Sequence, residues 1–275
     1  MRKEEILWRD ATEGNLEQVE LSLQDPTIDV NWGDPELNRT PFYRACGHGR
    51  MEVVKLFLDH PQVDVNKQNK DGATPFFIAC QSGHLEVAIT LMKDPRVEIN
   101  KGRDIGATPF YVACSHGHAE VVKRLLRDDR VEVSLTTRDG VTPFYIACQQ
   151  GHLEVVKELS MDSRINVNQA RDLGTTPFYV ACSHGQVDVV RELLKDSRID
   201  FNKRAADGVT PFYIACQQGH LQVVKDLIKK VDINIGRDMG ATPFYVACSH
   251  NQVAIVKELL KAKELDVNKQ TDEGK

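Results

Sequence analysis

The sequence has no apolar run long enough to cross a membrane and no cluster of basic residues. Its 275 residues include 35 Lys and Arg against 40 Asp and Glu, a formal net charge of −5. A membrane-spanning helix needs about 20 apolar residues in succession, and binding to nucleic-acid phosphates needs concentrated positive charge. We therefore expect no association with membranes or nucleic acids. The N-terminal Met-Arg-Lys-Glu-Glu also lacks the apolar stretch of a signal peptide, which favours a cytoplasmic or nuclear location.

Motifs that mark catalytic or cofactor sites are missing as well. The sequence has no phosphate-binding glycine loop, no metalloprotease helix signature and no isolated Ser or Cys nucleophile with a suitable base. The run Cys114-Ser115-His116-Gly117-His118 suggests metal ligands, but helical residues two apart point about 200° from each other. Later copies of this run carry Gln186 and Gln252 instead of the second histidine. We expect no enzyme activity, no cofactor and no metal site.

What the sequence does contain is a repeat. The tripeptide Thr-Pro-Phe occurs seven times, in steps of 34 residues except for the last step of 32. A fixed period of this length indicates one supersecondary unit copied along the chain, with each unit packing on its neighbours. We therefore predict a single domain, residues 1–275. The copies begin at Thr40, Thr74, Thr108, Thr142, Thr176, Thr210 and Thr242.

The copy that begins at Thr142 illustrates one repeat. Thr142 is suited to cap a helix, Pro143 to its first turn and Gly151 to its left-handed end. A second helix is predicted from His152, with apolar residues on one face and charged residues on the other. The alternating segment Ile165–Asn168 is predicted to be extended and to lead through a hairpin to the next copy. Helices this short depend on stacking for their stability.

The pattern Gly-x-Thr-Pro-Phe-Tyr-x-Ala-Cys-x-x-Gly-His-Leu-Glu-Val-Val-Lys-x-Leu, followed by Val-Asn, resembles the ankyrin repeat over essentially the whole chain. The usual Leu-His pair is replaced by Phe-Tyr in most copies, and the second Ala of the family pattern by Cys. The resemblance implies an all-α fold, an ankyrin-type α-solenoid of helix–turn–helix repeats with short hairpin loops. It also implies an interaction module without catalysis.

The two ends of the chain differ. Residues 1–38 repeat the helix-Gly-helix pattern without the Thr-Pro cap and with more polar residues, so we predict an N-terminal capping repeat there. Residues 39–264 form seven internal-type repeats, and residues 265–275 begin a further repeat or form a tail. Because the last second helix keeps internal-type apolar residues, we hypothesise that the chain is a segment of a longer array. A natural end whose tail folds back is the alternative.

Three residue types are predicted to hold the stack together. Equivalent helices lie about 8–10 Å apart, too far for the cysteines to form disulfides, so we expect buried, reduced thiols. The histidines after the turn glycine are expected to bond backbone groups at the start of helix two. The asparagines after Val or Ile are expected to hold the loop through side-chain hydrogen bonds. These residues are Cys46, Cys80, Cys114, Cys148, Cys182, Cys216 and Cys248; His84, His118, His152 and His220; and Asn66, Asn100, Asn168 and Asn234.

The repeats also alternate in pairs. Residues 140–159 and 208–227 differ at only two of twenty positions, whereas the copy between them reads differently. After the shared Ala-Cys, the pair Gln-Gln alternates with Ser-His. Tandem duplication of a two-repeat block explains this pattern, and recognition by a partner is the alternative.

The resemblance directs attention to the ends of helix one and to the hairpin tips, the usual partner-contacting positions on the concave side of ankyrin-like proteins. Exposed apolar residues in a row mark contact surfaces, although each tip residue could instead pack on the neighbouring hairpin. The candidate partner-binding residues are Ile105, Leu173 and Met239 at the tips; His116, His184, His250, Gln149, Gln150, Gln217 and Gln218 at the helix ends; and Arg103, Arg138, Arg171 and Arg237 in the hairpins.

The leading functional hypothesis is a monomeric, non-catalytic scaffold that binds a folded domain or a peptide along this surface. One alternative is a targeting module of a larger enzyme, channel or effector whose functional part lies beyond residue 275. The other is an architectural spacer, which the near-identity of the repeats favours because a unique partner normally demands varied contacts.

Overall fold

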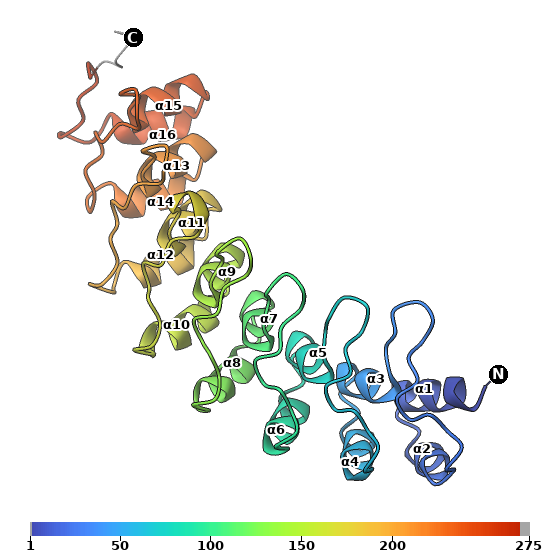
Figure 1. Ribbon diagram of the computed structural model, residues 1–275. Helices are drawn as coiled ribbons and strands as arrows, with labels where there is room; N and C mark the ends of the chain where they lie inside the picture. Colours follow the sequence, from blue (N-terminus) through green and yellow to red (C-terminus); the bar gives the residue numbers. More distant parts are fainter. Residues whose placement is uncertain (1, 270–275) are drawn as a thin grey trace. The chain divides into compact units, whose positions relative to one another are not determined.

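The computed structural model describes residues 2–269, and within this range it contains sixteen α-helices and no strand. The predicted all-α fold of helix–turn–helix repeats is confirmed. The helices divide between two compact units, Met1–Arg138 and Asp139–Lys275, which we call unit 1 and unit 2 (Figure 1). The prediction of a single domain over residues 1–275 stays a prediction.

Unit 1 holds the N-terminal repeat and the first three Thr-Pro-Phe repeats. The first helices of its repeats pack side by side in one layer, and the second helices form another. The hairpins extend beyond the first layer, away from the second (Figure 1). The first helices are α1 (Lys3–Glu13), α3 (Pro41–Gly47), α5 (Pro75–Gln81) and α7 (Pro109–Ser115), and the second helices are α2 (Leu16–Leu23), α4 (Met51–Asp59), α6 (Leu85–Lys93) and α8 (Ala119–Leu126).

Unit 2 repeats the same arrangement with four Thr-Pro-Phe repeats. Its first helices again contact one another, and so do its second helices. A short 3-10 turn, η1 (Asp172–Gly174), forms one hairpin tip. The first helices are α9 (Pro143–Gln150), α11 (Pro177–Ser183), α13 (Pro211–Gln218) and α15 (Pro243–Ser249), and the second helices are α10 (Leu153–Met161), α12 (Val187–Leu193), α14 (Leu221–Leu227) and α16 (Val253–Leu259).

The Thr-Pro-Phe motif starts every first helix except α1, as predicted. The Thr142 hydroxyl accepts a hydrogen bond from the backbone N–H of Tyr145 at 3.0 Å, and the same bond is made in all seven copies. Such a cap stabilises a helix by about 1 kcal/mol. Gly151 ends α9 with a φ of 78°, in the left-handed region.

The core lies between the stacked helices and is filled by the phenylalanines of the first six motifs, whereas Phe244 of the seventh is half-buried. Phe144, for example, is 1% exposed, and burying such a side chain stabilises the fold by about 1.5–3 kcal/mol. Six of the seven cysteines are buried as predicted, and burial raises the pKa of thiols such as Cys80. Cys248 is exposed, so the prediction is wrong there. Within residues 2–269, no later repeat covers the outer side of α15 and α16.

The asparagines hold the loops through side-chain hydrogen bonds, as predicted, and the structure adds that these bonds join consecutive loops. Asn66 donates through its side-chain amide to the carbonyl of Arg96 at 2.7 Å and accepts the backbone N–H of Glu98 at 2.9 Å. Because both bonds reach into the next repeat, they fix the register of one loop against the other. In the segment Ile165–Asn168, predicted to be extended, Val167 and Asn168 form a turn that the N–H of Gln169 closes onto the carbonyl of Asn166 at 3.1 Å, and Ile165 and Val167 are buried.

The histidines after the turn glycine have a different role from the one predicted. The Nε2 of His84 lies 3.0 Å from the carbonyl oxygen of Gly47, at the end of helix one of the preceding repeat. His118 reaches the carbonyl of Gln81 in the same way at 2.8 Å, and His220 that of Ser183 at 2.9 Å. The prediction of bonds at the start of helix two is therefore wrong for these three rings, because the last carbonyls of a short helix also need donors.

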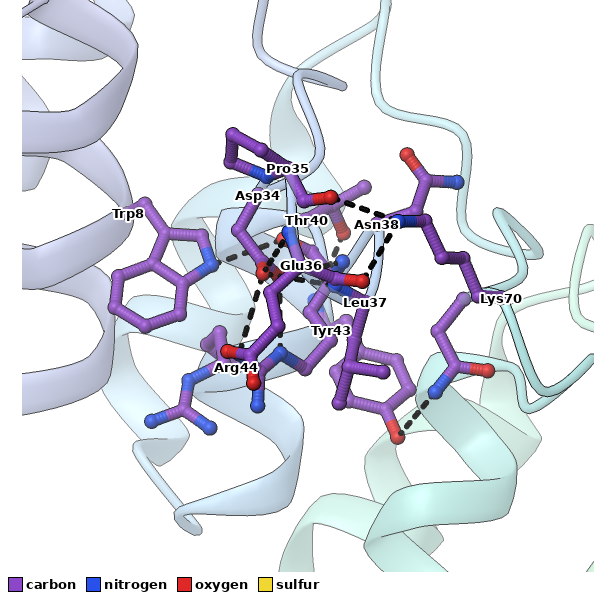
Figure 2. A network of polar contacts seen from close by, with 12 residues as sticks. Trp8, Asp34, Pro35, Glu36, Leu37, Asn38, Thr40, Tyr43, Arg44 and Lys70 are labelled. Carbon is purple, nitrogen blue, oxygen red and sulfur yellow. Dashed lines mark hydrogen bonds and ion pairs between the residues drawn. The ribbon is translucent and has the colours of Figure 1, made fainter.

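A polar network locks the N-terminal repeat onto the first hairpin (Figure 2). The Trp8 indole N–H donates to the carbonyl of Arg39 at 2.9 Å, and the Arg44 guanidinium lies 4.6 Å from the centre of the Trp8 ring. Burial alone would raise the pKa of Asp34, but hydrogen bonds from the Arg39 side chain and from the backbone of Leu37 and Arg39 lower it to about 2.

Candidate protein-binding surface

The apolar hairpin residues lie at the third position of a four-residue turn. The N–H of the following glycine closes the turn onto the carbonyl of Arg103, Arg171 or Arg237, at 2.8, 3.1 and 3.0 Å. The side chains are 55%, 70% and 57% exposed. We call them the tip residues; they are Ile105 in unit 1 and Leu173 and Met239 in unit 2.

Two of the tip residues have a strained backbone. Leu173 and Met239 have φ angles of 70° and 74°, in the left-handed region that favours glycine. Ile105, which is branched at Cβ, is not among the residues with positive φ. The side chains of Leu173 and Met239 stay mostly exposed despite the backbone strain. Packing against neighbouring residues therefore does not account for leucine and methionine at these two positions.

The tips touch the next hairpin through the backbone. The carbonyl of Ile105 accepts the N–H of Arg138 at 3.0 Å, and that of Leu173 accepts the N–H of Ala206 at 2.8 Å. Leu37 makes the same bond to the N–H of Lys70 at 2.8 Å. Leu37 was not among the residues predicted from the sequence, although it precedes Ile105 by two repeat lengths.

Paired polar side chains cap the ends of helix one in unit 2. His184 Nδ1 lies 3.0 Å from the carbonyl of Val180, and its Nε2 lies 3.4 Å from Nε2 of Gln149 on the neighbouring repeat. The carbonyl can only accept, so Nδ1 carries the proton and Nε2 accepts from the glutamine. His250 and Gln217 form the equivalent pair, also at 3.4 Å.

A second hydrogen bond joins the two repeats of each of these pairs. The Gln186 amide donates to the carbonyl of Gln149 at 2.8 Å, and the Gln252 amide to that of Gln217 at 3.2 Å. The intervening junction uses His220 and Ser183 instead. The alternation found in the sequence is therefore an alternation of two kinds of junction. Gln150 and Gln218 are exposed and stay available to a partner.

The four candidate arginines divide into two groups. Arg103 lies over the Phe77 ring at 5.7 Å and 3.6 Å from Asp71, and Arg171 lies over the Tyr145 ring at 5.7 Å. Both are half-buried, and their stacking supports the hairpins. The other two are exposed; they are Arg138 and Arg237.

His116, the remaining candidate, lies on unit 1 in the run that resembled a metal site. Its ring is exposed, stacks on His118 with centres 6.1 Å apart, and lies 2.9 Å through Nδ1 from the carbonyl of Val112. Cys114 is buried. Residues 2–269 contain no group of three or more metal-ligating side chains, and no helix in that range is long and apolar enough to span a bilayer.

These features define a helical repeat protein built from stacked helix pairs joined by hairpins. A family model described as Ankyrin repeats (3 copies) matches residues 7–103, 95–171, 164–237 and 198–271. The chain belongs to the ankyrin-repeat family. No curated protein matches it. Ankyrin repeats are generally protein–protein interaction modules, which sets the class of function.

Proposed function

We propose that the chain is a non-catalytic scaffold that binds a protein partner through its tip residues and the ends of helix one. The exposure of Leu173 and Met239 on a left-handed backbone carries this proposal. Such a backbone costs about 1 kcal/mol or more for a residue other than glycine, and strain of this kind gathers at ligand-contacting sites. Leu173 and Met239 are both exposed, apolar and in unit 2, so together they offer a partner an apolar contact surface that would account for the strained backbone.

The binding surface extends over several repeats. A stable interface buries about 800 Å² on each partner, more than one hairpin tip can supply. In unit 2, Leu173 and Met239 stand two repeats apart, with Gln150 and Gln218 exposed on the repeats that precede each tip. A partner of this surface is a folded domain or an extended peptide that contacts at least two consecutive repeats.

Replacement of both strained tips by asparagine tests the proposal. Asparagine accepts the left-handed backbone, so Leu173→Asn with Met239→Asn removes apolar contact area without imposing strain. Met161→Ser is the matched control, because Met161 is 82% exposed but ends a second helix. Each variant is used for affinity purification followed by quantitative mass spectrometry.

We expect proteins that bind the wild type and the control to be recovered at least about tenfold less with the double tip variant, while its unfolding midpoint is unchanged or higher. Equal recovery of partner proteins with the wild type and the double tip variant would show that the tip residues are not part of the binding surface. A large loss of stability would assign them to packing against the neighbouring hairpin, and failure of every form to capture a protein would favour the spacer.

A further inference from the structure

A cavity of about 690 Å³ opens in unit 2 between the ends of the last two second helices. Its volume falls in the range of small-ligand sites, roughly 300–1,000 Å³. It lies where α14 ends, against the loop after α14 and the loop after α16. Its walls include Ile228, Val231, Ile233, Glu258, Lys261 and Glu264.

At three other junctions an arginine stands at the equivalent place. Arg96 donates through Nη2 to the carbonyl of Leu58 at 2.8 Å, near the end of the preceding second helix, and through Nε to Asp94 at 3.0 Å. We call this arrangement the arginine bridge. Arg130 makes it to the carbonyl of Met92 at 2.7 Å, and Arg198 to that of Ser160 at 2.6 Å.

The asparagine bonds establish which residue stands at the arginine position in the last repeat. Asn168 donates to the carbonyl of Arg198 at 2.6 Å, and Asn234 donates in the same way to the carbonyl of Glu264 at 2.7 Å. Glu264 therefore replaces the arginine, and Ala262, two residues earlier, replaces the aspartate. The last junction keeps the register of the bridge but has neither of its side chains.

The last junction keeps the backbone carbonyl that accepts the hydrogen bond of the bridge. The residue equivalent to Leu58 and Ser160 is Ile228, immediately after α14. Carbonyls at a helix C-terminus carry partial negative charge and favour a cation. Glu264 adds a carboxylate where the three bridged junctions hold a guanidinium.

The charges around the cavity are balanced. Lys261 is paired with Glu258 at 2.7 Å. Three lysines oppose three carboxylates along the whole lining, so net charge does not favour an anion. The charged lining residues are Lys229, Lys261, Lys263, Asp232, Glu258 and Glu264.

We propose that this cavity binds an arginine side chain from an exposed segment of a partner protein. The incoming guanidinium replaces the missing bridge: it donates to the Ile228 carbonyl and pairs with the Glu264 carboxylate. Arg96, Arg130 and Arg198 show the arrangement within the same chain. The site uses none of the tip residues, so it stands independently of the proposed function.

The test uses the whole chain and the blocked tripeptide acetyl-Gly-Arg-Gly-amide, followed by amide chemical shifts in NMR titrations. The same peptide with citrulline keeps the shape of arginine without its charge. We expect the arginine peptide to shift the amides of Ile228, Asn234 and Ala262 and to bind at least about tenfold more tightly than the citrulline peptide, because charge-assisted hydrogen bonds are roughly twice as strong as neutral ones.

Two variants locate the binding site. Ala262→Asp with Glu264→Arg rebuilds the bridge within the chain, and we expect it to abolish binding and to raise the unfolding midpoint. Glu264→Gln removes only the carboxylate, and we expect binding to weaken at least about threefold. Glu86→Gln makes the same charge change on unit 1, at an exposed position, and should leave binding unchanged.

Three results would overturn the proposal. Equal shifts from the citrulline peptide would show that charge is not recognised. If the variant Ala262→Asp with Glu264→Arg folds and still binds the peptide as the wild type does, the peptide binds elsewhere. If that variant does not fold, unchanged binding by Glu264→Gln would lead to the same conclusion. Binding of acetate or inorganic phosphate at these amides without binding of the arginine peptide would make the cavity an anion site.

Discussion

The side chain of Asn168 spans two consecutive loops of unit 2: its amide donates to the carbonyl of Arg198 at 2.6 Å, and its oxygen accepts the N–H of Asp200 at 3.0 Å. One short side chain thus satisfies two backbone groups of the following repeat. Within residues 2–269, the side chain of Asn202, one repeat later, makes no such bonds, and only its backbone N–H donates, to Asp200 at 3.1 Å.

Replacement of Asn168 by alanine should therefore destabilise unit 2 by about 1–3 kcal/mol, because two backbone groups lose their partners. Urea unfolding followed by circular dichroism measures the change. Asn202→Ala is the control and should cost less than half as much. Equal losses would show that the Asn168 bonds add nothing to the stability of the fold.

Asp34 should make the stability of unit 1 depend on pH in the acid range. Its folded pKa of about 2 lies below the usual aspartate pKa of 3.8, so its contribution to stability is fully present above pH 3.8 and is lost as the pH falls through 2. Asp34→Asn should cost about 1–2 kcal/mol at neutral pH.

Both tryptophans of the chain, Trp8 and Trp32, lie in unit 1, so unfolding followed by tryptophan fluorescence reports on this effect. The difference between wild type and Asp34→Asn should shrink towards pH 2. Glu20→Gln, at an exposed position, controls for the loss of one negative charge. A difference that stays constant down to pH 2 would contradict the assignment.

The tip backbones should respond differently to a side chain branched at Cβ. Leu173→Val places such a residue at a φ of 70° and should cost about 1–2 kcal/mol. Ile105→Val keeps a branched side chain on a backbone without positive φ and should change stability by less than about 0.5 kcal/mol. Thermal unfolding of the two variants tests the contrast, which equal effects would refute.

One thiol should react much faster than the other six. Cys248 is exposed, whereas the remaining cysteines are buried and burial raises their thiol pKa values, as for Cys148 and Cys216. Titration of the native protein with a thiol reagent should give one fast equivalent, and Cys248→Ser should remove it. Two or more fast equivalents would mean that the core opens on the timescale of labelling.

The fold could be predicted in detail because each repeat carries its own local signals. Thr142 and Gly151 fix where a helix begins and ends, and the recurrence of Phe144 fixes what is buried. Bonds between repeats were harder to predict. His84 could hydrogen-bond to backbone groups of its own helix or of the preceding repeat, and which of these it reaches depends on how closely the two repeats pack.

The candidate surface was predictable in part. Tip positions follow from the hairpin pattern, but the strain at Leu173 depends on a backbone angle that the residue type does not reveal. Arg103 and Arg237 occupy the same place in the pattern, yet Arg103 stacks on Phe77 and Arg237 is exposed. The cavity beside Glu264 follows from the register between two loops, which the asparagine bonds make visible only in three dimensions.

The pairing of Gln149 with His184 and of Gln217 with His250 has a consequence for how this gene can change in length. Loss or gain of one repeat would place two Gln-Gln repeats, or two Ser-His repeats, next to each other and leave one glutamine or histidine without its partner. Loss or gain of two restores every pairing. Copy number in such an array is therefore expected to vary in even steps, so related alleles should differ by about 68 codons rather than 34.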